Sequence, residues 1–207
     1  MDILYPALAT VAAYLIGSLS FAVIVSKLMG LNDPRTYGSK NPGATNVLRS
    51  GSKAAAIVTL VLDALKGFVP VFAVQRFGQA YGLGDGTLAC VAFAAFIGHL
   101  YPVFFKFKGG KGVATAAGVI FGVHWLLGLA CIASFGIILF FSRYVSLASI
   151  AAAAFAPFYY LFGDRAAWYT SKTVLLAIFL IALLLAYRHR ENIERLFKGT
   201  ESKLGGS

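Results

Sequence analysis

Three glycines surround Lys111 in the segment Gly109-Gly110-Lys111-Gly112, and a long apolar run begins directly after it. Glycines leave backbone N–H groups open to a ligand and a lysine adds positive charge, so the pattern is typical of a loop that binds phosphate. It is not a Walker motif, which needs a glycine five residues before the Gly-Lys pair and a serine or threonine after it. Phe105 and Gly112 stand at those two positions. The alternative interpretation is a flexible hinge.

A second polar segment extends from Gly38 to Arg49. Asn41 followed by Pro42 predicts the start of a helix, with the asparagine as the N-cap and the proline in the first helical position. The free N–H groups of a helix start attract an anion, and cationic side chains strengthen the attraction. The side chains that we expect to face the anion are Ser39, Lys40, Thr45, Asn46 and Arg49. The alternative is a basic loop of turn residues.

A third polar segment, 187–196, begins where the last apolar run ends. Helical spacing places Arg188, His189 and Asn192 near one another on one face of this segment. Taken alone, the segment is best explained as a basic helix beside the membrane that contacts acidic lipids. Arg143 and Ser146 lie in a shorter polar stretch and are further candidates.

The composition indicates what kind of protein must position these segments. Of 207 residues, 59% are hydrophobic and 13% are charged, and the mean hydropathy is +0.78. A soluble domain has about 45–50% apolar residues and about a quarter charged residues. The chain has too little polar surface to cover a soluble globule, which excludes a soluble enzyme, a disordered tail and a secreted disulfide scaffold. We therefore predict an all-α integral membrane protein, although 18 basic and 8 acidic residues give it a net charge of +10.

The apolar runs set the number of membrane-spanning helices, because each span needs about 20 residues. The runs are 3–26, 54–75, 86–105, 112–142, 144–163 and 173–187. As one helix, the run 112–142 would be about 46 Å long, against a hydrocarbon core of about 30 Å. It also contains His124, a poor residue to face lipid. We predict that it breaks near 122–125 into two short spans, which gives seven transmembrane helices.

The distribution of basic residues supports seven spans. With seven, Arg76, Arg165 and Lys172 fall on one side and Lys66 lies within the membrane, so that the other 14 of the 18 Lys and Arg residues share the opposite side. The positive-inside rule then places the N-terminus outside and the C-terminus in the cytoplasm. With six spans this asymmetry would collapse. Residues 1–204 are treated as a single polytopic domain, and 205–207 (Gly-Gly-Ser) as a cloning remnant.

Two charged residues lie inside the run 54–75. Asp63 and Lys66 are three residues apart, on one helix face, and we predict that they pair within the membrane. A proton or substrate relay is the alternative. His99 is interpreted as structural. Because His99, His124 and His189 are dispersed without Cys or carboxylate partners, we predict no metal site.

The polar segments thus converge on one membrane face that carries hydroxyl, amide and cationic groups and few acids. Such a face is suited to bind two or more phosphate groups. The motifs Ser39-Lys-Asn-Pro-Gly-Ala-Thr-Asn-Val-Leu-Arg49, Lys108-Gly-Gly-Lys-Gly-Val-Ala-Thr115 with the preceding Gly98-His99, and His189-Arg-Glu-Asn-Ile-Glu-Arg195 resemble those of the bacterial acyl-phosphate:glycerol-3-phosphate acyltransferase family, PlsY. The resemblance covers essentially the whole chain.

The resemblance implies a multi-pass enzyme of the bacterial inner membrane with its active site at the cytoplasmic face. It would transfer a fatty acyl group from acyl phosphate to the 1-hydroxyl of sn-glycerol 3-phosphate, giving lysophosphatidic acid. It implies no cofactor, no nucleic acid partner and no direct use of acyl-CoA or acyl carrier protein. Contact with membrane lipids is expected.

The functional residues that carry over from the family are Ser39, Arg49, Lys111, His189 and Asn192. Beyond these, we predict that the phosphate groups contact Lys40, Asn41, Gly43, Ala44, Thr45, Asn46, Gly109, Gly110, Gly112, Arg143 and Ser146. The first two motifs contain no Asp or Glu that could act as a general base, so we expect a substrate phosphate oxygen to take the hydroxyl proton, with His189 as the rival base. A secondary transporter of a small organophosphate and a lipid-binding scaffold are the alternatives in other functional classes.

Overall fold

The computed structural model describes residues 3–205, which form α-helices and two short 3-10 helices without a β-strand. The long helices coincide with the apolar runs, since only a helix satisfies its own backbone hydrogen bonds inside a bilayer. The elements are α1 (Leu4–Gly17), α2 (Phe21–Leu28), α3 (Ala44–Leu48), α4 (Lys53–Phe77), η1 (Gly78–Tyr81), α5 (Asp85–Leu100), η2 (Val103–Phe105), α6 (Val113–Val123), α7 (Trp125–Ser142), α8 (Val145–Phe162), α9 (Lys172–Arg188) and α10 (Arg190–Phe197). Of the predicted cloning remnant, residues 206 and 207 lie outside the described residues.

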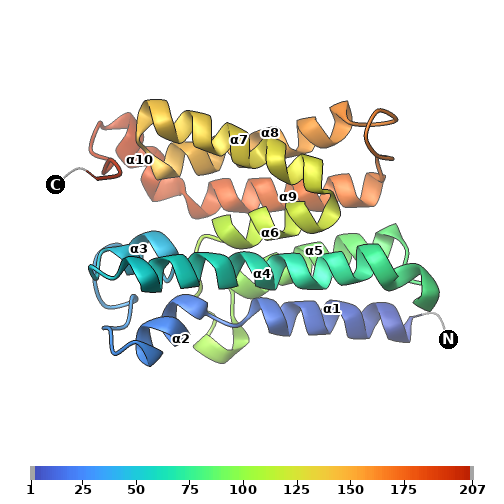
Figure 1. The fold of residues 1–207 in the computed structure, drawn as a ribbon, viewed down its shortest axis with the longest axis horizontal. Coiled ribbons are helices and arrows are strands. Elements are labelled where there is room, and N and C mark those ends of the chain that lie inside the picture. Colours follow the sequence, from blue (N-terminus) through green and yellow to red (C-terminus); the bar gives the residue numbers. More distant parts are fainter. Residues whose placement is uncertain (1–2, 206–207) are drawn as a thin grey trace.

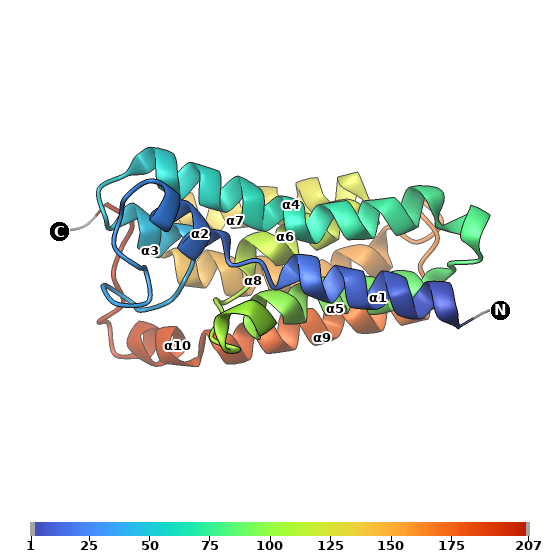
Figure 2. The ribbon, with the colours of Figure 1, turned by 90° about the horizontal axis from the view of Figure 1, so that it is seen from below.

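The long helices lie side by side in one elongated bundle. Figure 1 shows α7, α8 and α9 along one side, α1 along the other, and α4 to α6 between them. α6 is central, because it contacts α4, α5, α7 and α9. The N- and C-termini lie at opposite ends in both views (Figures 1 and 2), and α3 and α10 share the C-terminal end.

Glycines allow neighbouring helices to approach closely. A Cβ added to Gly118 on α6 would overlap the Ala64 carbonyl oxygen on α4, and one added to Gly67 on α4 would overlap the Thr115 carbonyl oxygen on α6. Gly17 on α1 meets the α5 backbone in the same way. Without a hydrophobic driving force between helices in lipid, such small-residue contacts are how membrane helices pack.

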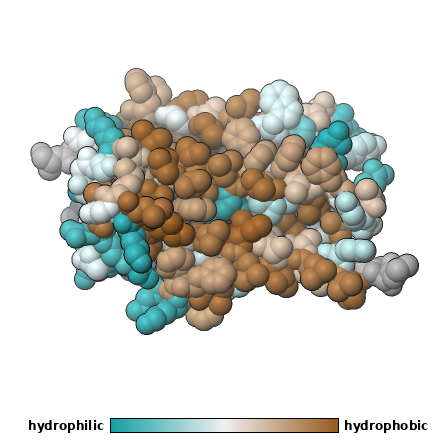
Figure 3. All heavy atoms as spheres, turned by 60° about the horizontal axis from the view of Figure 1, so that its bottom comes forward, coloured by the Kyte–Doolittle hydropathy of each residue, from teal (hydrophilic) through white to brown (hydrophobic). Residues whose placement is uncertain are grey.

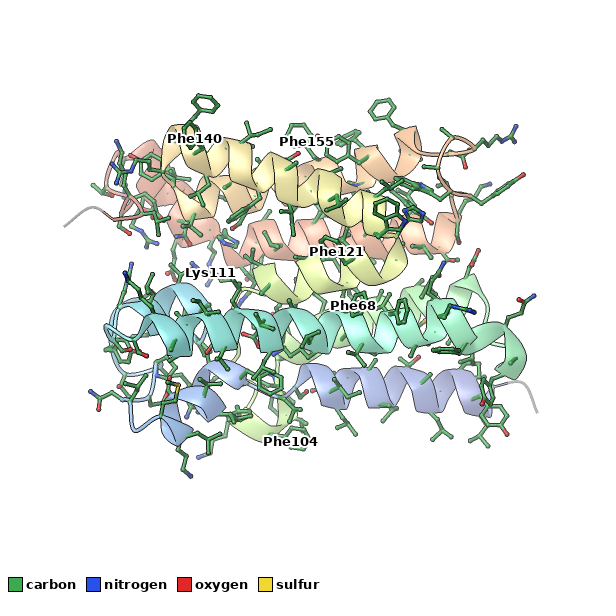
Figure 4. The ribbon with its side chains drawn as sticks, in the orientation of Figure 1. Phe68, Phe104, Lys111, Phe121, Phe140 and Phe155 are labelled. Carbon is green, nitrogen blue, oxygen red and sulfur yellow. The ribbon has the colours of Figure 1, made fainter. Side chains whose placement is uncertain are left out.

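The surface of the bundle suits a membrane. An apolar band covers its middle, and hydrophilic residues gather at both ends (Figure 3). Phe140 and Phe155 project from the outer side (Figure 4), with 78% and 43% of their area exposed. An exposed apolar belt of this kind is typical of a surface that contacts lipid.

The structure divides the run 112–142 where the sequence predicted. α6 ends at Val123, His124 has an extended backbone, and α7 runs back in the opposite direction (Figure 1). By length and composition, four helices could each span a membrane, or up to six if the bent pairs α1–α2 and α9–α10 each count as one span. The shorter apolar helix α6 would be a seventh. The count of seven and the orientation stay predictions.

The predicted charged pair within the bundle is confirmed. Lys66 Nζ lies 2.8 Å from Asp63 Oδ1 and donates a hydrogen bond of 2.6 Å to the carbonyl oxygen of Leu19, between α1 and α2. The Thr115 hydroxyl donates to the Asp63 carbonyl oxygen at 3.0 Å, which joins α6 to α4. His99 is also buried, with Nδ1 3.8 Å from Asp63 Oδ1. The cluster therefore ties four helices together beneath the polar end of the bundle.

Candidate active site

A cavity of about 420 Å³ opens at the end of the bundle that carries α3 and α10. Its lining brings together residues from the three polar segments that the sequence singled out. The predicted residues among them are Ser39, Lys40, Asn41, Arg49, Gly109 and Lys111. The remaining lining residues are Arg188, Arg190, Glu191, Arg195, Thr200 and Ser202.

The loop before α3 is held by a buried asparagine. The Ser39 N–H donates to Asn46 Oδ1 at 3.0 Å, and Asn46 Nδ2 donates to the carbonyl oxygens of Pro34 at 2.7 Å and Tyr37 at 3.2 Å. Asn46 is 2% exposed, so its amide shapes the loop and does not face the cavity. This arrangement presents Ser39 at the rim.

The predicted helix start at Asn41-Pro42 is wrong. The helix begins at Ala44, and Gly43 is its N-cap with an extended backbone. The reason is that the Asn46 amide holds the preceding chain in a loop, through hydrogen bonds with Pro34, Tyr37 and Ser39. As a result Gly43, Ala44 and Thr45 lie outside the lining of the cavity, although Asn41 belongs to it.

The glycine loop packs tightly beneath the cavity. A Cβ on Gly109 would overlap the His99 carbonyl oxygen, and a Cβ on Gly110 would overlap the His99 ring. The Gly110 N–H donates to the His99 carbonyl oxygen at 3.3 Å. Gly112 has a φ of +85° and precedes α6, so the loop opens a helix as predicted. Gly109 lines the cavity, whereas Gly110 and Gly112 shape the loop from below.

Arg188 clamps this loop from the end of α9. Its Nη2 donates to the carbonyl oxygens of Gly109 and Gly110, both at 3.0 Å, and its Nε donates to Gly110 at 3.3 Å. The guanidinium also lies over the Tyr101 ring, 5.9 Å from its centre. The sequence placed Arg188 near His189 but gave no sign that its partners are backbone carbonyls.

Lys111 extends from the clamped loop towards α10. Figure 4 shows it between the α3 region and the end of α9. Its Nζ donates to Oδ1 of Asn192, a residue that is 7% exposed. Burial and the nearby Arg195 lower the pKa of the Lys111 ammonium. The partner of this cation is therefore a neutral amide oxygen, which an incoming phosphate can replace.

His189 lies at the junction of α9 and α10 and is 3% exposed. Its Nδ1–H donates to the Leu185 carbonyl oxygen at 2.8 Å, which leaves the lone pair on Nε2. Burial lowers the pKa of His189 to about 4, and the charge of Lys111 acts in the same direction. The imidazole is therefore neutral near pH 7.

The chain after α10 folds back over the site. Ser146 donates from Oγ to Glu201 Oε1 at 2.8 Å, and Arg143 donates from Nη2 to the Leu204 carbonyl oxygen at 3.0 Å. Both predicted residues thus contact the C-terminal segment and are absent from the cavity lining. Arg49 Nη2 reaches the Ser202 hydroxyl at 3.4 Å.

Sequence reasoning missed the contributions of Arg195, Thr200, Glu201 and Ser202. Arg195 lies on α10, and the other three lie after its end, in a segment that carries no periodic signal in the sequence. The one hint in the sequence was Glu201, a single acidic residue that follows the basic segment 187–196. Within residues 3–205, no group of three or more His, Cys, Asp or Glu side chains is placed to hold a metal ion.

The chain is similar to known proteins over nearly all of its length. The family model described as glycerol-3-phosphate acyltransferase matches residues 7–199. The glycerol-3-phosphate acyltransferases of Albidiferax ferrireducens and Bordetella petrii are 65% and 61% identical, over 99% and 93% of this chain and 92% and 90% of theirs.

Two crystal structures of PlsY, an integral membrane glycerol 3-phosphate acyltransferase, share this fold. The glycerol 3-phosphate form has a TM-score of 0.87 at 41% identity, and the lysophosphatidic acid form has 0.85 at 40%. Each comparison covers 97% of this chain and 96% of the other. The chain is therefore an integral membrane protein of the glycerol-3-phosphate acyltransferase family.

Proposed function

We propose that this acyltransferase takes a fatty acyl group from acyl phosphate and transfers it to the 1-hydroxyl of sn-glycerol 3-phosphate. The products are 1-acyl-glycerol 3-phosphate and inorganic phosphate. The observation that supports this best is the convergence of Ser39, Arg49 and Lys111 on one cavity at the polar end of an apolar bundle. An acyl chain can remain in the lipid there while its phosphate reaches water-exposed cations.

In this proposal, Arg49 and Lys111 hold the phosphate of glycerol 3-phosphate. An arginine can bind two phosphate oxygens at once, and the lysine adds a point charge. Ser39 completes the acceptor site from the cavity lining; His189 and Asn192, which are buried and absent from that lining, are proposed to reach it from beneath with neutral hydrogen-bonding groups. Together, the two cations and these neutral groups suit glycerol 3-phosphate, in which a phosphate is joined to a carbon chain that carries hydroxyl groups.

The donor phosphate is proposed to lie against Lys40, Asn41 and Gly109, which line the same cavity. Asn46 fixes the first loop, Gly43, Ala44 and Thr45 begin the helix behind it, and Gly110 and Gly112 shape the second loop. The acyl chain would extend between helices into the lipid. Arg143 and Ser146 would act through the C-terminal segment that they bind.

The chemistry requires little from the protein beyond placement. The acceptor oxygen attacks the acyl carbon, the bond from that carbon to the phosphate oxygen breaks, and the phosphate leaves with the hydroxyl proton. Holding the two reactants in position can contribute up to about 7–11 kcal/mol. A neutral His189 with a free Nε2 lone pair is suited to accept a hydrogen bond from the hydroxyl and orient it.

The assay is direct. Purified protein is incubated with glycerol 3-phosphate and palmitoyl phosphate, and phosphate release and lysophosphatidic acid are measured, with palmitoyl-CoA and palmitoyl-acyl carrier protein as alternative donors. We expect product from palmitoyl phosphate alone. Product from palmitoyl-CoA at an equal rate would contradict the donor assignment, and no product from any donor would defeat the enzyme assignment.

The role of His189 has its own test. We expect His189→Ala to weaken binding of the acceptor while most turnover survives at saturating substrates. A general base contributes about 10²–10⁴-fold. A loss of that size in kcat, restored by added imidazole, would show that His189 takes the proton and that the phosphate oxygen does not.

The site is proposed to face the cytoplasm of a bacterial inner membrane. The basic segments gather at the end of the bundle that carries the C-terminus, in agreement with the positive-inside rule (Figure 1). A cysteine placed beside Arg143, in a chain whose Cys90 and Cys131 are replaced by alanine, should react with an impermeant reagent only from the cytoplasmic side. Reaction from outside would overturn this orientation.

A transporter of a small organophosphate is less favoured, because the polar residues of the cavity lie at one end of the bundle and transporter sites lie near the membrane midplane. Uptake of labelled glycerol 3-phosphate into proteoliposomes distinguishes the two functions. Accumulation in the vesicles without acyl transfer would favour the transporter.

A further inference from the structure

The C-terminal segment 200–204 crosses the polar end of the bundle and closes one side of the cavity. The Leu204 N–H donates to the Arg143 carbonyl oxygen at 2.7 Å, and Thr200 and Ser202 line the cavity. The segment begins just after residue 199, where the match to the family model ends. The side chain at its centre is Glu201.

Glu201 is the acceptor for three side chains from two helices. Its Oε1 accepts hydrogen bonds from Ser146 Oγ on α8 at 2.8 Å and from Asn192 Nδ2 on α10 at 2.6 Å. Its Oε2 accepts from Arg195 Nε at 2.7 Å. The carboxylate is 7% exposed. Burial alone would raise the pKa of Glu201, but the hydrogen bonds from Asn192, Arg195 and Ser146 outweigh it and lower the pKa.

These contacts decide which way the Asn192 amide points. A carboxylate only accepts hydrogen bonds and an ammonium only donates them. With Glu201 on one side and Lys111 on the other, the amide must turn its NH₂ to Glu201 and its oxygen to Lys111, as the structure shows. Without Glu201 the Asn192 NH₂ loses its acceptor, so the amide is held only by Lys111 and can rotate away from the position in which it fixes that ammonium.

We propose that Glu201 is a positioning residue: through the Asn192 amide, it holds Lys111 in place to bind the phosphate of the acceptor. The inference rests on the proposed function, and it adds a residue outside the three motifs. The Glu201 carboxylate is tolerated within a phosphate site because it already accepts hydrogen bonds from Ser146, Asn192 and Arg195. The carboxylate therefore presents little uncompensated negative charge to the substrate.

The test compares Glu201→Ala with Glu194→Ala. Both variants remove one carboxylate near α10, but Glu194 pairs with Lys198 on the outer face, where both side chains are about two-thirds exposed. We expect Glu201→Ala to raise the KM for glycerol 3-phosphate by about 10- to 100-fold, since hydrogen bonds to charged groups are lost. The KM for palmitoyl phosphate should change less than about twofold, as should both constants of Glu194→Ala.

A double-mutant cycle with Asn192→Ala separates positioning from a general structural role. If Glu201 acts through Asn192, removing it in the Asn192→Ala background should change the KM for the acceptor by less than about twofold. A full further loss in that background would overturn the proposal, as would an unchanged KM in the single variant.

Two further measurements keep the outcome clear. Glu201→Gln preserves the side-chain volume, and its single oxygen cannot serve three donors, so it should raise the same KM by about 3- to 10-fold even if the alanine variant does not fold. A Glu201→Gln enzyme with the wild-type KM would overturn the proposal. A wild-type protein that is inactive with both substrates would instead refute the proposed function.

Discussion

The Arg188 clamp offers a sharp test of how the site is held. The carbonyl of Gly110 belongs to the peptide bond that joins Gly110 to Lys111, so the hydrogen bonds from Arg188 fix the peptide plane from which the Lys111 side chain departs. Arg188→Lys keeps the positive charge and the position over the Tyr101 ring. It replaces a planar fork of donors by one ammonium, which cannot match two carbonyl groups in the same geometry.

The size of the effect follows from the contacts. Arg188 makes two hydrogen bonds of 3.0 Å and one of 3.3 Å, to two carbonyl oxygens. A hydrogen bond that involves a charged group contributes about 1.5–3 kcal/mol, and lysine retains at most part of this set. If one such contribution is lost from the transition state, kcat/KM for glycerol 3-phosphate falls roughly 10- to 150-fold.

Arg76→Lys is the matched control. Arg76 also lies in the last turn of a long helix, α4, and over an aromatic ring, that of Phe77 at 5.6 Å. It is not part of the cavity lining. Rates of phosphate release from palmitoyl phosphate should fall for Arg188→Lys and stay at the wild-type value for Arg76→Lys, with the helical circular dichroism spectrum in detergent unchanged for both. A wild-type kcat/KM in Arg188→Lys, or an equal loss in both variants, would refute the clamp.

Three further predictions concern the bundle and His189. Asp63→Leu leaves Lys66 as a buried cation without its partner, so the free energy of unfolding should fall by about 3–5 kcal/mol, and an unchanged Tm in detergent would contradict this. Gly118→Val should prevent α6 from packing on α4 and abolish monodisperse protein on size exclusion, whereas Gly136→Val, with nothing within 4 Å of an added Cβ, should not. Because the pKa of His189 is lowered to about 4, the unfolded chain binds one more proton between about pH 6.5 and 4, and stability should fall as the pH drops through that window. His189→Gln should lose this part of the pH dependence of Tm. A profile of Tm against pH identical to that of the wild type would contradict the lowered pKa of His189.

The helices and the break at His124 could be predicted because they follow from the thickness of the bilayer. An apolar run of 31 residues, 112–142, is too long for one span, and its glycines and histidine mark the weakest point. The structure ends α6 one residue before His124. Membrane proteins are favourable for this reasoning, because the solvent itself fixes the length of the elements.

The motifs located the cavity, but not the partner of each side chain. The sequence could not show that Asn46 binds Pro34 and Tyr37 and so delays α3, since this depends on how the loop folds back on the helix. It treated Asn41 as a cap because an Asn-Pro pair is a common local signal. Tertiary hydrogen bonds took precedence over that local preference.

The role of acidic residues also differs from the expectation. The sequence suggested that acids are kept away from a phosphate site, yet Glu191 lines the cavity and Glu201 is buried beside it. The difference arises because net charge on a membrane face says nothing about pairing within it. A carboxylate that binds Arg195 and Asn192 serves as part of the scaffold.

Pairing also explains which cations remain to bind a substrate phosphate. Arg188 is engaged by the loop carbonyls and Arg195 by the Glu201 carboxylate, so both are committed to the scaffold. Arg49 meets only the Ser202 hydroxyl, at 3.4 Å, and Lys111 the Asn192 amide oxygen, among the contacts within residues 3–205. Neutral partners give way to a dianion far more readily than a carboxylate does, because the gain in charge attraction is greater than the hydrogen bond lost. Lys40 and Arg190 also line the cavity. Among the lining cations, however, Arg49 and Lys111 are the two whose side chains hydrogen-bond to a neutral side chain, and they are the two proposed here for the acceptor phosphate.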